Sequence, residues 1–456
     1  MLKYLSVRQK EAIGLLQIGT LLEYFDLMLF VHMSVLLNDL FFPKSDPHTA
    51  SLIYAFALCS AYILRPFGAL LFGYIGDNFG RKVTVVISSF MMAFSCIIMA
   101  NLPTYEQIGI TAAWGITLCR VLQGLSCQGE LIGVEIYLTE ITKPPVRYPV
   151  VSLTSFFSSL GGMFALGLAN LLNTFNISWR MAFWIGAAIS SIGFTARARL
   201  RETPEFIKMQ KRQRSLKKED SSSLVPLEWS GYTKYKTIFA YFLISCGFPA
   251  CFYLSYIHCG GILKNAYGFT SKEIIHHNFL LSIVHCTSFI LYSLASYKIN
   301  PLTILKIRLY FFFPFILFYP YFISVIATPN ELFIFQSIII GFSIVDVPAA
   351  GIIMNHFPVL KRITSTSLIY AFSRVSIYVI TSFGMVYLTD IFNNWGVWFL
   401  MIILCIGFSW SIRHYETLEK MKRQSLFYFI TRFVKERIKK FFKPLEIKSN
   451  ATQENA

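Results

Sequence analysis

The sequence predicts an all-α membrane protein with twelve transmembrane helices in two bundles of six. Of its 456 residues, 55% are hydrophobic and only 14% are charged, whereas about a quarter of the residues in an average soluble domain are charged. The apolar residues also come in runs of about 20, the length that crosses a bilayer as a helix. A polar stretch, residues 199–236, divides these runs into two groups.

The expected spans follow one another with short polar connectors, most of which contain Pro or Asn. Their ranges are 12–37, 50–74, 83–101, 107–131, 150–173, 179–198, 238–262, 274–296, 304–327, 332–354, 364–389 and 395–412. The chain therefore divides into a first bundle (1–198), a linker (199–236), a second bundle (237–412) and a basic tail (413–456). No cleavage site follows the first apolar run, so we expect it to remain as a span.

Basic residues accumulate on the cytoplasmic side of membrane proteins. With the N-terminus inside, the other side receives only Lys44, Arg180, Lys264 and Lys272. We therefore expect both termini in the cytoplasm, and the net charge of +17 mostly reflects topology. A solvated face beside anionic lipid explains this charge better than nucleic-acid binding does.

Two cytoplasmic segments lie outside the spans. The linker is polar and basic, with room for one short surface helix but not for a catalytic domain. The tail places apolar residues at helical spacing between lysines and arginines, which predicts a basic amphipathic helix on anionic lipid. A coiled coil would need several heptads that the tail lacks. The apolar positions are Phe427, Ile430, Val434, Ile438 and Phe441.

Motifs of enzymes and metal sites are not found in the sequence. The nine cysteines all lie in apolar segments, and none pairs at metal-ligand spacing. No phosphate loop, dinucleotide-binding glycine pattern or nucleophile elbow occurs in a polar segment. We therefore expect no enzymatic activity, metal or cofactor, and an ion gradient as the source of energy.

Charged residues inside the spans of the first half are costly and call for a partner or a function. Glu23 and Asp26 in the first span, Arg65 in the second and Arg120 in the fourth all lie about 16–22 Å along their helices, at 1.5 Å per residue. One interpretation is a polar cavity where a carboxylate takes up a proton and the arginines meet an anionic group. The alternative is a buried ion-pair network that holds three helices together.

Two motifs in the first half resemble the major facilitator superfamily of transporters. Its loop between helices two and three is similar to Gly73-x-x-x-Asp77-x-x-Gly80-Arg81-Lys82, and its fourth-helix signature to Arg120-x-x-Gln123-Gly124 with Tyr137-x-x-Glu140. The resemblance implies that Glu140 pairs with Arg81 in a cytoplasmic gate that breaks when the two halves rock. An ordinary surface salt bridge is the alternative.

A set of shorter motifs over residues 10–206 resembles the metabolite:proton symporter branch, which includes proline/betaine, α-ketoglutarate, citrate and shikimate permeases. They are Glu23-Tyr-Phe-Asp26, Arg65-Pro-Phe-Gly68, Gln128-Gly-Glu130, Trp179-Arg180 and Arg201-Glu-Thr-Pro-Glu-Phe206. The resemblance implies proton-coupled uptake of a small zwitterion or organic acid by a monomer in a bacterial inner membrane. The implied proton and substrate site is Glu23, Asp26, Arg65, Arg120 and Gln123.

The second half departs from the family pattern. After the tenth span the family's Glu-x-Phe-Pro-x-x-x-Arg is replaced by a sequence that begins with Asn355 and ends with Arg362. Arg362 therefore joins the predicted gate, but a non-transporting sensor or scaffold on the same fold stays an alternative function. A membrane-embedded enzyme is the weakest third hypothesis. Candidates for the opposite wall of the cavity are His258, His285, Asp346 and Arg374.

Overall fold

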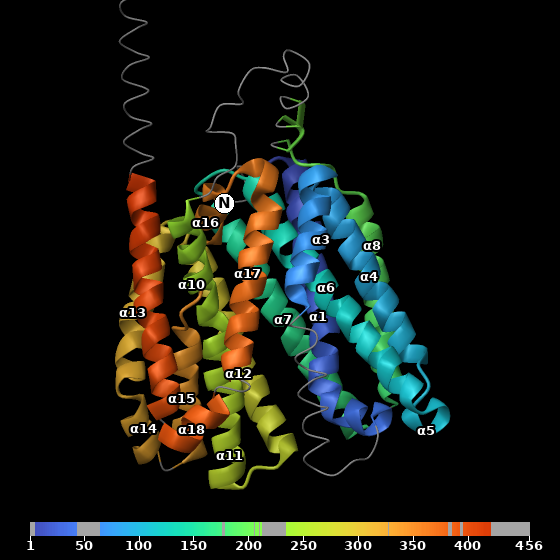
Figure 1. The fold of residues 1–456 in the computed structure, drawn as a ribbon, viewed down its shortest axis with the longest axis vertical. Coiled ribbons are helices and arrows are strands. Elements are labelled where there is room, and N and C mark those ends of the chain that lie inside the picture. Colours follow the sequence, from blue (N-terminus) through green and yellow to red (C-terminus); the bar gives the residue numbers. More distant parts are fainter. Residues whose placement is uncertain are drawn as a thin grey trace, which may run out of the picture.

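The protein is a bundle of helices in the computed structural model, with no strand in the described part of the chain (Figure 1). The structure describes residues 5–42, 64–175, 178–204, 206–208, 210–211, 234–326, 328–381, 385–392 and 395–420. The predicted second span up to residue 63, most of the linker and the amphipathic tail lie outside these ranges.

The helices of the first half fall where the apolar runs are. They are α1 (Val7–Phe41), α3 (Arg65–Asn78), α4 (Arg81–Asn101), α5 (Tyr105–Ile108), α6 (Ile110–Ile141), α7 (Arg147–Thr174) and α8 (Trp179–Ala198). The fourth span was expected to end at 131, but α6 continues for ten further residues. Its last turns bring two more carboxylates, Glu135 and Glu140, into the packed interior.

The second half is more broken. Its helices are α10 (Tyr235–Phe252), a π-helical turn (Tyr253–His258), α11 (Cys259–Tyr267), α12 (Ser271–Ala295), α13 (Pro301–Leu317), α14 (Tyr319–Val325), α15 (Pro329–Gly341), α16 (Ala350–Ile353), α17 (Arg362–Val379), α18 (Met385–Phe392) and a last helix, Trp395–Lys420. Two 3₁₀ turns, Met354–His356 and Val359–Lys361, join α16 to α17.

Six helices in the described residues are long and apolar enough to cross a membrane, or seven if the bent pair α13–α14 is one span. The chain is therefore a multi-pass membrane protein, while the count of twelve spans stays a prediction. Proline accounts for the bend of 59° between α13 and α14, because Pro320 lacks the N–H that would continue the helix. The range predicted as the tenth span is interrupted, since α15 ends at Gly341 and the backbone is irregular over residues 342–349.

The outer surface carries large apolar side chains, as lipid contact requires. Phe67, Trp114, Tyr310 and Ile406 are each more than half exposed, whereas the eight described cysteines are buried and free. A soluble protein, in contrast, rarely exposes large contiguous apolar surface.

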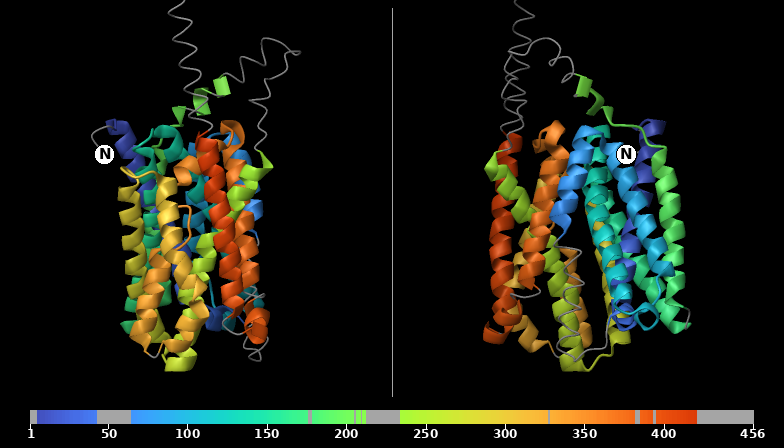
Figure 2. Two further views of the ribbon diagram at one scale, coloured as in Figure 1. Left: turned by 90° about the vertical axis from the view of Figure 1, so that its left-hand side faces the viewer. Right: turned by 45° about the vertical axis from the view of Figure 1, so that its right-hand side comes forward.

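Two sets of helices stand side by side, α1–α8 and α10 to Lys420 (Figure 2). They meet where α3 and α6 pack on α17 and where α7 packs on α12. The start of α1 and the end of α6 share one end of the molecule, since Gln9 donates a hydrogen bond to the Ile141 carbonyl (2.6 Å). Figure 1 shows the last helix ending there too. This agrees with a common side for these segments; that this side is cytoplasmic stays a prediction.

Candidate functional site

Charged residues from both halves meet at this shared end in an inter-half cluster, defined here as Asp77, Arg81, Glu140, Arg362 and Thr364. Arg81 of α4 is fully buried and lies 3.5 Å from Asp77 and 3.2 Å from Glu140. Arg362 from the second half lies 3.0 Å from the same Glu140 oxygen. One carboxylate on α6 thus joins an arginine from each half.

Backbone contacts add to the cluster. Arg81 donates to the carbonyls of Gly76 (2.7 Å) and of Val359 in the second half (2.5 Å), and its guanidinium stacks on Phe206 (4.6 Å). Thr203 donates to the second oxygen of Glu140 (2.6 Å). Several charge-assisted hydrogen bonds therefore compensate the cost of burying these charges.

Asp77 caps a helix of the opposite half. Its carboxylate accepts hydrogen bonds from the backbone N–H groups of Ile363 (3.2 Å) and Thr364 (3.0 Å) and from the Thr364 hydroxyl (2.7 Å). These are N–H groups of the first turn of α17, which have no partner within their own helix. A carboxylate at this position is also stabilised by the helix dipole.

Glycines allow the close approach that these contacts need. A Cβ on Gly73 would lie 2.7 Å from the Thr364 Cα, so α3 and α17 touch through backbone at this point. Gly80 has a φ of +123°, which side chains rarely adopt, and it starts α4 where Glu202 accepts from the backbone N–H groups of Arg81 (3.0 Å) and Lys82 (3.2 Å). Lys82 takes part in this cap through its backbone N–H.

The structure therefore brings together the residues predicted for the cytoplasmic gate; that they act as a gate stays a prediction. Sequence reasoning gave no role to Thr364, Glu202 or Thr203. Glu202 and Thr203 lie in the motif Arg201–Phe206, which was noted in the sequence. The motif alone did not show that this segment packs against Arg81.

The predicted proton and substrate residues are buried within the first half. Glu23 lies 3.8 Å from Arg197 of α8 and accepts from Ser126 of α6 (3.4 Å). The Arg197 guanidinium occupies the space beside Gly19 and donates to Ser89. The Arg197 side chain is 2% exposed and lies inside the bundle.

Asp26, Arg120 and Gln123 form a neighbouring group. Asp26 accepts from Ser190 and packs against Gly186, where a Cβ would come within 2.5 Å of its oxygen. Arg120 donates to Gln123 (3.0 Å) and stacks on Phe30 (4.1 Å). Asp26 and Arg120 both interact electrostatically with Cys96 of α4. One partner of Glu23, Arg197, comes from α8, which the depth comparison did not include.

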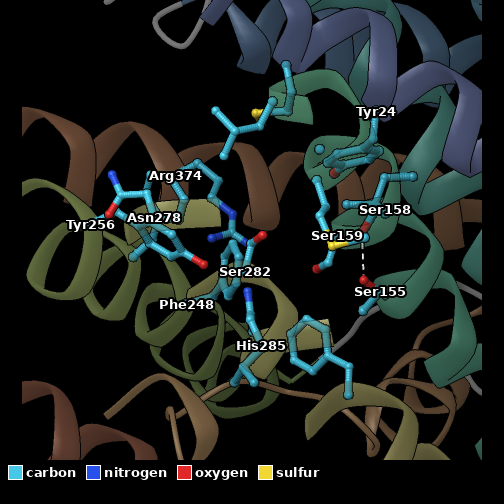
Figure 3. A pocket seen from close by; sticks show the side chains of 18 of the residues that line it. Tyr24, Ser155, Ser158, Ser159, Phe248, Tyr256, Asn278, Ser282, His285 and Arg374 are labelled. Carbon is cyan, nitrogen blue, oxygen red and sulfur yellow. Dashed lines mark hydrogen bonds between the residues drawn. The ribbon is translucent and has the colours of Figure 1, made fainter. Parts of the chain in front are cut away.

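A cavity of about 360 Å³ lies between the two halves (Figure 3). Tyr24 of α1 and Ser155, Ser158 and Ser159 of α7 line one side, and Asn278, Ser282 and His285 of α12 line the other. Phe248, Phe252 and Tyr256 of α10 and the π-helical turn add an aromatic wall. The volume suits a small solute.

Arg374 of α17 supplies a cation to this cavity. Its side chain points into the space between the labelled residues (Figure 3), donates to the Tyr370 hydroxyl (2.6 Å), and lies over the rings of Tyr370 (4.4 Å) and Phe248 (5.0 Å). Aromatic rings and one hydroxyl thus fix the guanidinium. An arginine fixed in this way is well placed to bind a carboxylate.

Two acidic residues line the cavity as well, Glu135 of α6 and Asp346 of the irregular segment. Glu135 is 5% exposed, and it interacts electrostatically with Asp346 and Arg374. Neither carboxylate forms an ion pair within 4.0 Å with any part of the chain that the structure describes.

The cavity is therefore lined by a different charge set from the one predicted. Glu23, Asp26, Arg65, Arg120 and Gln123 are not among its lining residues, although Arg65 interacts electrostatically with Tyr24 and Tyr370, which are. Depth along a helix follows from residue number, whereas the direction of each side chain depends on helix rotation. Of the second-half candidates, His285, Asp346 and Arg374 line the cavity. Glu135 was missed because the fourth span was expected to end at 131.

Residues 15–228 match the sequence model of a family described as sugar (and other) transporter. An inner membrane metabolite transport protein of Escherichia coli, YhjE, is 34% identical over 208 residues, which are 44% of this chain and 47% of the relative. The proline/betaine transporter of Escherichia coli is 31% identical over 205 residues, 43% of this chain and 41% of the relative. The chain thus aligns with less than half the length of these relatives.

Solved structures extend the likeness to most of the chain. The proton:xylose symporter XylE, a major facilitator superfamily protein, superposes with a TM-score of 0.69 at 15% identity and covers 90% of this chain and 95% of its own. The human organic anion transporter MFSD10 gives a TM-score of 0.64 at 15% identity, with 88% and 99% covered.

The fold is therefore that of the major facilitator superfamily, and the sequence resemblance stated for the first half is confirmed. Residues 15–228 also resemble the sugar (and other) transporter family in sequence. The matched family and relatives are named as transporters rather than enzymes, as the sequence predicted.

Proposed function

We propose that this protein is a secondary transporter that takes up a small zwitterion or organic acid together with protons, in the cytoplasmic membrane of a bacterium. The observation that carries the proposal is the cavity between the halves, which both halves line with polar and charged groups. The bacterial relatives named for proline/betaine and metabolite transport support it.

The chemistry of the cavity favours a zwitterionic solute. Arg374 offers a fixed cation for a carboxylate, and Asp346 offers negative charge for a cationic group. The aromatic wall of Phe248, Phe252 and Tyr256 suits a quaternary or secondary ammonium, because such cations are attracted to ring faces.

The inter-half cluster supports alternating access. Its ion pairs and the cap on α17 join the two halves at the shared end. These contacts are discrete, so they can break when one half rocks against the other, as in transporters built from two repeated bundles.

Uptake by purified protein in liposomes tests the proposal. With an inside-alkaline pH gradient, labelled glycine betaine or proline is expected to accumulate above its external concentration, and a protonophore is expected to abolish the accumulation. Empty liposomes are the control. Saturable binding of both solutes without any uptake would contradict transport.

That last result would instead favour the sensor or scaffold. One observation points that way: the family match ends at residue 228, so the second half has diverged in sequence. The intact cluster argues against decay, because Arg362 and Thr364 of the second half still contact Glu140 and Asp77.

A further inference from the structure

We propose that Glu135 is the residue that takes up the coupling proton, and that its protonation admits the solute carboxylate to Arg374. The inference rests on the proposed function and assigns its coupling to a residue outside the motifs of the first half. Glu135 lies on α6 in the first half, whereas Arg374 and Asp346 belong to the second half. The three groups face one cavity across the boundary that moves during transport.

Glu135 is a buried carboxylate at the wall of the cavity. Its side chain is 5% exposed and lines the cavity, and no hydrogen bond or ion pair joins it to a described residue. A buried carboxylate with no compensating partner is costly to keep ionised. The same group has access to protons through the cavity, so it can exchange a proton when the cavity opens.

The charged and titratable groups around Glu135 come from several elements. Asp346 adds a second negative charge and Arg374 a positive one, and Tyr370 of α17 and Tyr241 of α10 also interact with the carboxylate. From the first half, Tyr24 of α1 and Arg65 of α3 lie beside Tyr370. The described residues of α7 that line the cavity include three serines, which carry no charge.

The earlier candidates are placed differently. Glu23 has Arg197 and Ser126 as partners, and Asp26 accepts from Ser190, all within the first half. Neither lines the cavity. Protonating them would not change the charge that a solute meets there.

The coupling follows from charge balance in the cavity. With Glu135 and Asp346 ionised, Arg374 is the only arginine or lysine among the described lining residues and faces two carboxylates. A zwitterionic solute brings an ammonium, which Asp346 and the aromatic wall can hold, and a carboxylate. That carboxylate is a third negative charge around Arg374, which like-charge repulsion disfavours. One proton on Glu135 removes one negative charge, so proton and carboxylate enter together, and both leave when the cavity opens to the other side.

Glu135→Gln tests the proposal in proteoliposomes with labelled glycine betaine as the probe. Glutamine mimics the protonated carboxyl group, so exchange of internal for external betaine is expected to continue within about twofold of wild type. Accumulation driven by a pH gradient is expected to be lost. A gradient of one pH unit supports about tenfold accumulation for one proton per solute, which sets the size of the signal.

Glu106→Gln is the matched control, because Glu106 is exposed in the first turn of α5, away from the cavity. It is expected to accumulate betaine as wild type does. Glu135→Asp keeps a titratable group and is expected to restore part of the accumulation.

The outcomes separate the two proposals. If wild type accumulates betaine and Glu135→Gln does so equally, the assignment of Glu135 is wrong while transport stands. If wild type takes up neither betaine nor proline under the pH gradient, the proposed function fails, and the coupling role fails with it. If Glu135→Gln loses exchange as well as accumulation and Glu135→Asp does not recover both, the residue is structural and the inference is overturned.

Discussion

At the scale of single residues, Glu140 links the two halves, because its carboxylate forms ion pairs with both Arg81 and Arg362. Replacing one member of a buried charge pair costs about 3–5 kcal/mol, since the charge that remains is uncompensated. We predict that Glu140→Gln lowers the thermal unfolding midpoint of the purified protein markedly. Glu202→Gln is the control: it weakens the cap of α4 and the hydrogen bond from the Thr203 N–H (2.9 Å), for about 1 kcal/mol. Equal midpoints for the two variants would contradict the role of Glu140.

Asp77 offers a second test at this scale, since it caps α17 from the other half. Asp77→Ala is expected to destabilise the protein by more than the roughly 0.5–2 kcal/mol that loss of a helix cap costs, because it also removes the ion pair with Arg81. A double-mutant cycle with Thr364→Ala in chemical unfolding measures the contact itself. We expect a coupling energy of about 0.5–3 kcal/mol, whereas additive effects would show that the two side chains do not interact.

Single residues also show why the sequence predicted one site better than the other. The cluster is encoded by motifs of fixed spacing, so Asp77, Arg81 and Glu140 could be assigned to it from the sequence alone. The cavity depends on helix rotation and on where α6 ends, and neither follows from hydrophobicity. Glu23 and Glu135 are both acids in apolar helices, yet only Glu135 faces the cavity.

At the scale of elements, the crossing of α3 and α17 depends on Gly73. A Cβ there would come within 2.7 Å of Thr364, whereas a Cβ on Gly14 of α1 meets nothing within 4 Å. We predict that Gly73→Ala destabilises the protein, because backbone must move apart. Gly14→Ala is expected to stabilise it by about 0.5–1 kcal/mol through helix propensity. Thermal unfolding of both variants checks the contrast, and equal shifts would contradict the close crossing.

The irregular segment between α15 and α16 is a second element with a specific support. Arg308 of α13 is fully buried, donates to the Val347 carbonyl (2.6 Å) and the Ser343 hydroxyl (3.1 Å), and lies over the Tyr292 ring (4.5 Å). These bonds fix the segment that presents Asp346 to the cavity.

We predict that Arg308→Lys weakens solute binding although Arg308 does not line the cavity, because one ammonium cannot reproduce the two-pronged donor geometry. The thermal shift that glycine betaine causes is expected to fall well below that of wild type. Lys306→Arg is a matched control on the same helix, since Lys306 pairs with Glu416 at the partly exposed surface. An unchanged shift in Arg308→Lys would show that the segment does not need this support.

The sequence predicted the positions of the helices well but not their interruptions. Composition and run length define where a span lies, and every predicted range overlaps helix in the described residues. The π-helical turn at Tyr253–His258 contains neither Gly nor Pro and so gave no signal. The break after Gly341 contains Asp346 and Pro348, but run length alone did not show that the helix stops there. Both breaks lie next to the cavity, where departures from regular structure are most often tolerated.

At the scale of the whole molecule, the two halves form a closed contact at the shared end and a cavity beyond it. The central claim is that this contact must open for solute to cross. A disulfide across it tests the claim, because a Cβ on Gly73 would lie 3.0 Å from the Thr364 Cβ. That is slightly below the usual Cβ separation of a disulfide, about 3.5–4.5 Å, so a small shift suffices.

The measurement uses Gly73→Cys with Thr364→Cys in a background whose nine native cysteines are replaced. Each single cysteine variant in that background is the control for oxidation alone. The account predicts that the oxidised double variant in liposomes takes up no glycine betaine and that reduction restores uptake. Equal uptake by the oxidised and reduced forms, with the cross-link confirmed by mass spectrometry, would contradict it.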